Sequence, residues 1–433
     1  MTRPQALSAS SAPLRVTMLS LHTSPLAQAG SGDAGGLNVY VDALSRALRR
    51  AGTAVDIVTT TADDSGQPCQ DETAVLEDGR VVHTLGLGAR GDRDKNGLVA
   101  GTADLVRRAL QRIGGRQGSP VDLIHSHYWI SGLAGLEMAA ELDVPLIHTM
   151  HTIGVVKTEQ DPGSVEDPRR AEAESRIAAQ AAALTANTER EAADLIRLFG
   201  VSEENLAVIP PGVDLETFSS PAGTSQAADR PAAELLQLTF AGRLQRHKGP
   251  QVAIEAVARL LRDAPAIAVH LTIAGQRSGG DFDAAALISR LGIEDHVTTL
   301  PALPHAELAA LFRASDAVLV PSYSESFGLV ALEAMACGAP VLAHRVGGLA
   351  ELVVDAQTGW LIDSLDSREW AARIRDVAEL RHEASGARGW QAMSSAAVRR
   401  AGDFSWDTSA SLAQDLYQRA VARQSAGHSP EVA

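Results

Sequence analysis

Cysteine is scarce in this chain. The 433 residues contain 2 cysteines, Cys69 and Cys337, whose spacing suggests neither a disulfide framework nor a zinc site. We therefore expect a reducing compartment, the cytoplasm. An excess of positive charge is also missing, because 38 Lys and Arg stand against 53 Asp and Glu, for a formal net charge of -15. This balance argues against a general surface for nucleic acid or an anionic membrane, so any phosphate site must be a local basic patch.

Long apolar runs are absent too. No segment reaches the roughly 18 uninterrupted apolar residues of a membrane span, and we predict no membrane partner. Residues 1–13 are rich in Ser, Ala and Pro, which predicts a disordered leader rather than a signal peptide, and residues 426–433 are predicted to be a disordered tail. With 45% hydrophobic residues, the chain is too long for one ordinary core, and two domains are expected.

Strand and helix signals alternate in the first half of the chain. A polar, acidic stretch at 63–96 predicts a hairpin or a variable loop. The remaining segments predict a parallel sheet flanked by helices. The expected strands are 14–21, 54–59, 121–125, 145–149, 183–186 and 206–209, and the expected helices are 39–51, 102–113, 132–142, 171–182 and 189–199.

The alternation resumes after a linker at 219–231 that is rich in Ser, Ala, Gly and Pro. We expect one domain at 14–215, a second at 216–404, and a helix at 405–425 that returns to the first. The fold class is α/β, with two Rossmann-like doubly wound domains and a cleft between them. In the second domain the expected strands are 236–241, 270–274, 297–300, 317–320, 341–344 and 358–362, and the expected helices are 251–262, 282–291 and 305–314.

The stretch 317–340 is a buried strand, a turn and a helix. Glu325 and the amides near Gly328 follow the strand, where a doubly wound sheet places its ligands. On a regular helix Glu333 is rotated only about 80° from Glu325, so both carboxylates can serve one cleft for sugar hydroxyls. The alternative is that Glu325 caps the helix and Glu333 is a solvated surface residue.

A strand, a glycine-rich loop and a helix are also predicted near the start of the chain. The loop spans 30–38, and its amides suit an anion at the amino terminus of the following helix. A tight structural turn is the alternative, since the order of the glycines is not that of dinucleotide folds.

Two histidine clusters follow the expected strands at 121–125 and 145–149. No Cys or Glu nearby completes a metal-ligand set. We interpret the clusters as part of a sugar-binding or catalytic cleft in which His151 and Thr152 face the reacting centre. For His151, and more so for His125, the alternative is a hydrogen-bonded structural histidine.

Cations gather at two places. Lys157, Arg169 and Arg170, with Lys95 and Tyr128, predict a small basic pocket for a phosphorylated acceptor, and a solvated helix face is the alternative for the two arginines. Arg243 and Lys248 follow the strand at 236–241, and two cations there suit a nucleotide diphosphate leaving group, with surface cations on a loop as the alternative.

Residues 325–334 resemble the E-x7-E signature of the retaining nucleotide-sugar glycosyltransferases of the GT-B fold, which include sucrose-phosphate synthases and bacterial mannosyltransferases. The similarity extends over residues 14–425. Four further motifs, at 22–25, 32–40, 125–132 and 242–250, closely resemble the D-inositol 3-phosphate glycosyltransferases of mycothiol biosynthesis. The resemblance implies a transfer of N-acetylglucosamine from UDP-GlcNAc to 1D-myo-inositol 3-phosphate with retention at the anomeric carbon.

The resemblance also implies site residues. Those expected at the reaction centre are His151, Arg243, Lys248 and Glu325. Acceptor contacts are expected at His22, Asp33, Ala34, Gly35, Gly36, Leu37, Asn38, Lys95, Tyr128, Thr152 and Arg170, with Arg169 as the alternative to Arg170. Donor contacts are expected at Gln28, Ala29, Gly36, Arg243, Lys248, Leu303, Glu325 and Glu333. A magnesium ion is expected on the main-chain carbonyls of Phe312, Arg313, Ser315 and Ala339.

No carboxylate in the sequence is an evident nucleophile. We therefore expect same-face attack, in which the UDP phosphate accepts the proton of the acceptor hydroxyl, rather than a double displacement. Two rival functions are a sucrose-phosphate synthase-like transfer to fructose 6-phosphate and a sugar-nucleotide-binding protein without activity. The expected assembly is a homodimer.

Overall fold

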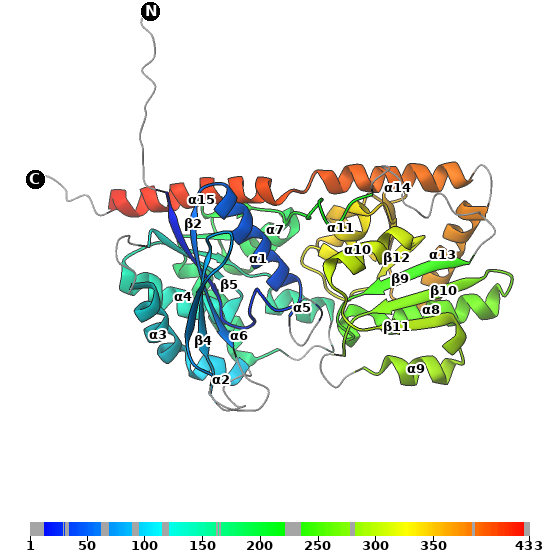
Figure 1. The fold of residues 1–433 in the computed structure, drawn as a ribbon, viewed down its shortest axis with the longest axis horizontal. Coiled ribbons are helices and arrows are strands. Elements are labelled where there is room, and N and C mark those ends of the chain that lie inside the picture. The colour runs from blue at the N-terminus through cyan, green and yellow to red at the C-terminus, as the bar shows by residue number, and fades with distance from the viewer. Residues whose placement is uncertain are drawn as a thin grey trace, which may run out of the picture.

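The computed structural model describes residues 13–28, 30, 34–61, 69–88, 95–114, 121–161, 163, 166–220, 235–277, 282–382 and 386–427. Two separate sheets, one in each half of the chain, organise these residues, and helices pack around both (Figure 1). The expected leader, except for Pro13, and residues 428–433 of the expected tail lie outside the described residues, as do Ala29 and Asp33. Among the described residues, no helix has both the length and the apolarity needed to cross a bilayer.

The upstream sheet has 8 strands in the order β3-β4-β2-β1-β5-β6-β7-β8. All neighbours are parallel except β3, which runs antiparallel to β4. Within the stretch 63–96, where a hairpin or a variable loop was expected, β3 and β4 form a hairpin, and β4 is in addition a buried parallel member of the sheet. The strands are β1 (Arg15–Ser20), β2 (Ala54–Thr61), β3 (Glu72–Val75), β4 (Val81–Gly86), β5 (Leu123–His127), β6 (Leu146–Thr149), β7 (Ala183–Ala186) and β8 (Leu206–Val208).

The upstream helices are α1 (Gly36–Arg50), α2 (Lys95–Ala100), α3 (Thr102–Gly114), α4 (Trp129–Leu142), α5 (Gly154–Gln160), α6 (Pro168–Gln180) and α7 (Glu189–Phe199). Helices α1, α4 and α6 begin earlier than predicted. Helix α6 begins at Pro168, rather than near 171, because the Asp167 side chain accepts a hydrogen bond from the Arg169 amide and a proline suits the first helical position. Arg169 and Arg170 therefore lie in the first turn of a helix.

The downstream sheet has 6 parallel strands in the order β11-β10-β9-β12-β13-β14. Its strands are β9 (Leu236–Ala241), β10 (Val269–Ala274), β11 (Val297–Leu300), β12 (Ala317–Val320), β13 (Val341–His344) and β14 (Gly359–Ile362). Its helices are α8 (Pro250–Asp263), α9 (Ala284–Leu291), α10 (His305–Ala314), α11 (Leu329–Ala336), α12 (Leu349–Leu352), α13 (Ser367–His382) and α14 (Gly386–Gly402). The sequence patterns did not predict α13 and α14, which contribute the fully buried Trp370 and Trp390 to the core.

The last helix, α15 (Trp406–Gly427), leaves the downstream half and packs along α1 of the upstream half (Figure 1). The hydroxyl of Tyr417 lies 2.6 Å from Nδ1 of His125 in the interior of β5, and both side chains are buried. This contact ties the end of the chain to the middle of the first sheet.

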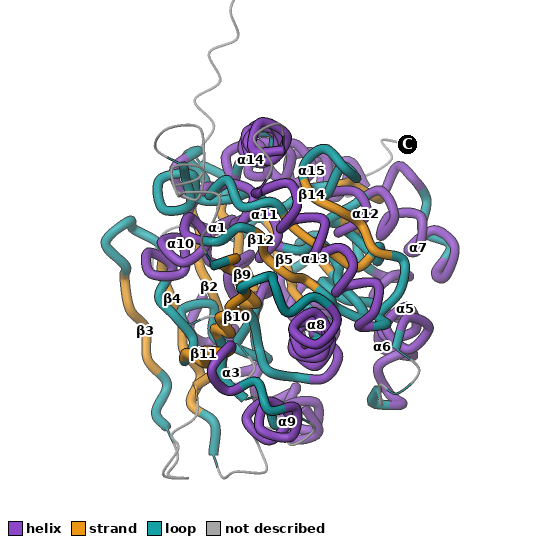
Figure 2. The backbone as a smooth tube through the Cα atoms, turned by 90° about the vertical axis from the view of Figure 1, so that its right-hand side faces the viewer, coloured by secondary structure: helices purple, strands orange, loops and turns teal. Residues whose placement is uncertain are grey.

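The strand orders place one crevice between the two sheets. β1 lies between β2 and β5, and β9 lies between β10 and β12, so the chain reverses its direction of winding beside β1 and β9. Ligands of doubly wound folds bind outside the carboxyl ends of strands at such points. The view of Figure 2 shows the strands and their covering helices from the downstream side. The fold class expected from the sequence is confirmed.

Replacing Tyr417 by Phe should destabilise the protein. The substitution keeps the ring but leaves a buried histidine nitrogen without its partner, which typically costs about 1–3 kcal/mol. Urea denaturation measures the free energy of unfolding of each variant. The control is Asp415→Asn on the exposed face of the same helix, which should change it by less than about 0.5 kcal/mol. Equal values for the two variants would contradict the structural role of the contact.

Candidate active site

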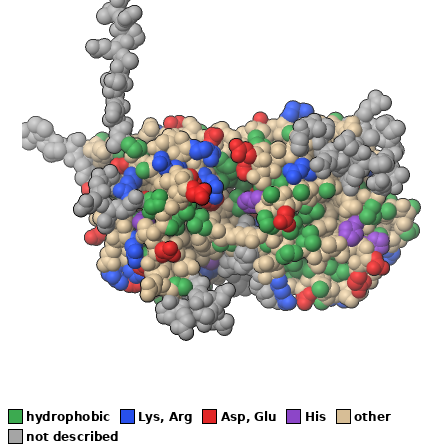
Figure 3. All heavy atoms as spheres, viewed as in Figure 1, with side chains coloured by type: hydrophobic (Ala, Val, Ile, Leu, Met, Phe, Trp, Pro, Cys, Tyr) green, Lys and Arg blue, Asp and Glu red, His purple; other side chains and the backbone are tan. Residues whose placement is uncertain are grey.

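A cavity of ≈ 640 Å³ lies between the two halves. The loops that follow β1, β5 and β6 line it from upstream, and the loops that follow β9, β10 and β12 line it from downstream. On the face shown in Figure 3, Lys and Arg side chains are interspersed with Asp and Glu instead of forming one basic area. The cations that could bind a phosphorylated ligand line the cavity itself.

The turn after β12 holds Glu325 by backbone contacts. Its carbonyl accepts a hydrogen bond from the Gly348 amide at 3.0 Å, and a Cβ added to Gly347 would lie 1.8 Å from the same oxygen. Helix α11 begins only at Leu329, after Gly328 with a φ of 104°. Glu325 is therefore neither on the helix nor its cap, so the rotation estimated from a regular helix does not apply. Both Glu325 and Glu333 nevertheless line the cavity.

Lys248 reaches Glu325 from the short turn that follows β9. Its Nζ lies 2.7 Å from Oε2 of Glu325, and the Ser322 hydroxyl donates to the same oxygen at 3.2 Å. A Cβ on Gly249 would lie 2.0 Å from the carbonyl oxygen of Pro321, so a glycine is needed for this close approach. The lysine is thus held beside the turn that follows the carboxyl end of β12.

Arg243 spans the crevice. A Cβ added to Gly35, just before α1, would lie 3.5 Å from its Nε. The guanidinium therefore approaches the amino terminus of α1 from the opposite half, so a ligand bound at this point would contact both halves.

Glu333 is a buried carboxyl group, not a surface residue. It is 7% exposed, and burial raises its pKa to about 8. The group is largely protonated at pH 7, so it can donate a hydrogen bond to a hydroxyl as well as accept one.

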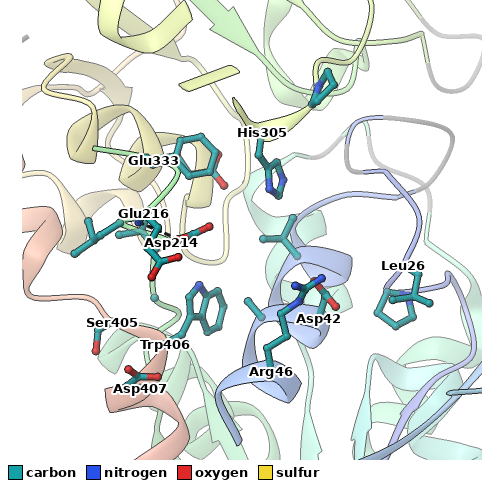
Figure 4. Close-up of a pocket in the computed structure, with 18 of the residues that line it drawn as sticks. Leu26, Asp42, Arg46, Asp214, Glu216, His305, Glu333, Ser405, Trp406 and Asp407 are labelled. Atoms are coloured by element: carbon teal, nitrogen blue, oxygen red, sulfur yellow. Dashed lines mark hydrogen bonds and ion pairs between the residues drawn. The ribbon is translucent and has the colours of Figure 1, made fainter. Parts of the chain in front are cut away.

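Glu333 also borders a second cavity of ≈ 940 Å³, together with Leu303 and His305 (Figure 4). Residues 25–28, helix α1, the segment 212–218 and the start of α15 also contribute to its lining. Gln28 lines this second cavity and donates to the carbonyl of Ala302 at 3.1 Å, which joins the upstream and downstream halves.

Asn38 organises the start of α1. Its Oδ1 accepts hydrogen bonds from the Thr23 hydroxyl at 3.0 Å and the Gly35 amide at 2.9 Å, and its Nδ2 donates to the carbonyl of Ser24 at 2.5 Å. The side chain is therefore occupied in shaping the loop. Gly35, Gly36, Leu37 and Asn38 line the cavity, and Ala34 is buried.

A cationic pocket is built around Tyr128. The Arg170 guanidinium lies 5.1 Å from the centre of the tyrosine ring, Lys95 Nζ lies 5.8 Å from it, and the His22 ring stacks on it at 5.2 Å. Arg170 also donates to the carbonyl and the hydroxyl of Thr152, at 2.6 and 2.8 Å.

Arg169 and Arg170 point to different places. The Arg169 side chain is 45% exposed and binds Asp167, whereas the Arg170 side chain is 3% exposed and lines the cavity. The geometry therefore favours Arg170 over Arg169 as a ligand-facing residue, and a solvated face is the better description of Arg169.

The histidines form a buried network. His125 contacts the Tyr417 and Thr149 hydroxyls, so it is structural. His127 Nδ1 lies 3.0 Å from Nε2 of His151, and the carbonyl of His151 accepts a hydrogen bond from the Ser326 hydroxyl of the downstream half. Among the described residues, no group of three or more His, Cys, Asp and Glu side chains could hold a metal ion. Burial lowers the pKa of His151 to about 3, so at neutral pH the imidazole is neutral and is not an acid.

The residues expected to bind magnesium lie away from the crevice. Phe312 and Arg313 lie in the last turn of helix α10, Ser315 follows that helix, and Ala339 precedes β13. These positions are at the amino ends of β12 and β13, opposite the ligand-binding edge of the sheet. The carbonyl of Phe312 accepts from the Ser315 amide at 3.0 Å. Carbonyls at a helix carboxyl terminus suit a hard cation, but an ion here would not reach a ligand in the cavity.

A crevice between two doubly wound sheets, with a cation–carboxylate pair beside a helix amino terminus on one side and a cationic pocket on the other, defines a GT-B glycosyltransferase. The family models agree. Residues 34–217 match Glycosyltransferase Family 4, and residues 226–388 match Glycosyl transferases group 1.

Among curated relatives, the D-inositol 3-phosphate glycosyltransferase of Arthrobacter sp. is 44% identical over 430 residues, covering 96% of this chain and 99% of that protein. That of Kribbella flavida is 41% identical and covers 97% of this chain and 99% of its own. The chain belongs to the family of the D-inositol 3-phosphate glycosyltransferases.

Solved structures show the same fold. The sucrose-phosphate synthase of Thermosynechococcus elongatus superimposes with a TM-score of 0.76 at 27% identity, covering 95% of this chain and all 100% of that one. Anabaena HepE in complex with UDP-glucose gives a TM-score of 0.67 at 21% identity, covering 96% of this chain and 100% of that one.

The buried histidines should make the protein sensitive to acid. Burial lowers the pKa of His148 and His151 from 6.5 to about 3 in the folded state. Below pH 6.5 the unfolded chain binds protons that the folded protein does not, so stability falls as the pH falls toward 3. The slope is at most roughly 1.4 kcal/mol per pH unit for each histidine.

Thermal unfolding at constant ionic strength, between about pH 7 and about pH 5, measures this loss. His148→Asn removes one titrating group and should make the pH dependence shallower relative to its own value at neutral pH. A melting temperature that does not change over this interval would contradict the interpretation.

Proposed function

We propose that the protein transfers N-acetylglucosamine from UDP-GlcNAc to 1D-myo-inositol 3-phosphate with retention of anomeric configuration, a step of mycothiol biosynthesis. One observation carries the proposal: two separate sets of cations face one cavity from opposite sides. Arg243 and Lys248 suit a diphosphate, and Lys95, Lys157 and Arg170 suit a monophosphate. The names of the relatives support this choice of acceptor.

The donor is assigned to the downstream side. Lys248 is paired with Glu325, and the amino terminus of α11 lies beside the pair, so the departing diphosphate meets an ammonium group, a guanidinium and backbone amides. The protonated Glu333 is assigned to the ribose hydroxyls, and the backbone near Leu303 to the uracil. The complex of the structural relative HepE with UDP-glucose supports a UDP-sugar donor.

The acceptor is assigned to the upstream side. Its phosphate lies against Lys95, Lys157 and Arg170, and its ring lies near Tyr128 and the start of α1. The neutral His151 offers a hydrogen bond near the reacting centre, and we assign it no proton transfer. In this arrangement the acceptor hydroxyl and the diphosphate meet across the crevice.

The charge state of the carboxylates favours same-face attack. Glu325 and Glu333 are the acidic side chains among the described residues that line the cavity. The first is paired with Lys248, and the second is largely protonated at pH 7. Neither is a free nucleophile, so a covalent glycosyl-enzyme is disfavoured. The bond from the anomeric carbon to the UDP oxygen breaks, the acceptor oxygen bonds to that carbon on the same face, and the departing UDP phosphate takes the proton of the acceptor hydroxyl.

Three further expectations accompany this proposal. Magnesium on the main-chain carbonyls of Phe312, Arg313, Ser315 and Ala339 would stabilise the end of α10 without taking part in the reaction. A homodimer and a cytoplasmic location are the expected assembly and compartment.

Radiolabelled UDP-GlcNAc, incubated with either inositol 3-phosphate or fructose 6-phosphate, tests the acceptor. We expect product with inositol 3-phosphate and little with fructose 6-phosphate, the rival suggested by the similarity to sucrose-phosphate synthase. Nuclear magnetic resonance of the product should show an α-linked sugar, because the sugar is α-linked in the donor and the configuration is retained. An inverted product, or binding of UDP without turnover of any acceptor, would overturn the proposal.

Lys248→Ala should lower kcat about a hundredfold or more, because the developing charge on the diphosphate loses its ammonium partner. The control is Arg262→Ala on helix α8, whose side chain is 64% exposed. Steady-state assays with both substrates saturating separate the two variants. A rate for Lys248→Ala close to that of the control would exclude the assigned role.

A further inference from the structure

Glu166 holds two cations of the acceptor pocket at once. Its Oε1 lies 2.5 Å from Nζ of Lys157, and its Oε2 lies 2.7 Å from Nη1 of Arg170. Lys157 and Arg170 both line the cavity. Although burial alone would raise it, the pKa of Glu166 falls to about 2 because of these two cations, so the side chain is an anion at neutral pH. Lys157 and Arg170, to which the acceptor phosphate is assigned, are therefore already paired with the Glu166 carboxylate.

A second carboxylate holds Arg170 in a different way. Glu174 Oε1 lies 2.6 Å from its Nε, and the Gly154 amide donates to both oxygens of Glu174, at 3.0 and 3.2 Å. The Glu174 side chain is 0% exposed, whereas that of Glu166 is 14% exposed. Glu174 is therefore fixed in the interior, and Glu166 has a route to solvent.

The hydrogen bonds of Arg170 leave little room for a ligand. Its four hydrogen bonds, to Glu174, Glu166 and the two oxygens of Thr152, use the Nε hydrogen, one Nη1 hydrogen and both Nη2 hydrogens. A single Nη1 hydrogen remains. A phosphate that binds the guanidinium through two hydrogens needs the one that Glu166 now accepts. Two anions close together on the same cations also repel each other.

We propose that Glu166 is a displaceable counter-ion with which the acceptor phosphate competes for Lys157 and Arg170, and that Glu174 is the permanent positioning residue for Arg170. Glu166 keeps the two cations paired while the pocket is empty, and it weakens the binding of simple anions such as inorganic phosphate. The polyol ring of the acceptor must then supply the remaining binding free energy. This inference rests on the acceptor site assigned above.

The two carboxylates should respond in opposite directions to the same substitution. Glu166→Gln removes the competing charge, so the dissociation constant for inorganic phosphate should fall about tenfold, and KM for inositol 3-phosphate should fall with it while kcat does not rise. Glu174→Gln loosens Arg170, so the phosphate dissociation constant should rise. Glu166→Asp keeps the competing charge, so it should bind phosphate more weakly than Glu166→Gln does.

Isothermal titration calorimetry of the full-length protein with inorganic phosphate, without donor, measures these constants. Glu172→Gln, on the exposed side of the same helix, is the matched control and should leave them unchanged. Thermal unfolding of each variant separates a change in affinity from a loss of folded protein. Weaker or unchanged phosphate binding by a folded Glu166→Gln variant would overturn the proposal.

This experiment is independent of turnover. If the wild-type protein transfers no sugar to inositol 3-phosphate, the proposed function fails, whereas the phosphate constants of the Glu166 and Glu174 variants still decide the role of each carboxylate.

Discussion

The pairing of cleft cations with carboxylates from their own half of the molecule is the interaction on which the site depends. Lys248 is held by Glu325, and Arg170 by Glu174 and Glu166. A partly buried cation without a partner is costly, because its desolvation is not offset. Each pair therefore allows a positive group to remain in the crevice before any substrate arrives. A phosphate can then replace or join the resident carboxylate.

The topology of the two sheets determines where these ion pairs lie. In each parallel sheet the carboxyl ends of the strands carry the polar turns, and the reversal of winding beside β1 and β9 opens a crevice there. Helix α15 crosses from the downstream half and packs on α1, with Tyr417 bonded to His125. The same fold that forms the cleft thus places the last helix against the core of the first sheet.

Neutral groups complete the site. Burial leaves Glu333 largely protonated and His151 uncharged at neutral pH. The charged chemistry is consequently confined to the cations, Glu325 and the substrate phosphates. This separation is consistent with a mechanism in which the leaving diphosphate, rather than a side chain, accepts the proton.

Local patterns in the sequence were sufficient for most of the elements and for the residue types at the ends of the strands. The glycine turns before α1 and α11, the Glu325 to Glu333 spacing and the Arg243 to Lys248 turn are all short-range features. The sequence alone therefore identified the fold class and these four charged residues, which line the cleft.

Tertiary structure decided the rest. The first turn of α6 sends Arg170 inward and Arg169 outward, a difference of about 100° between adjacent helical positions that a sequence without a helix start does not reveal. Burial, which depends on contacts between distant segments, made Glu333 neutral and His125 structural. The partners of Arg170, and with them the proposed role of Glu166, appear only when α5 and α6 pack together beneath Tyr128.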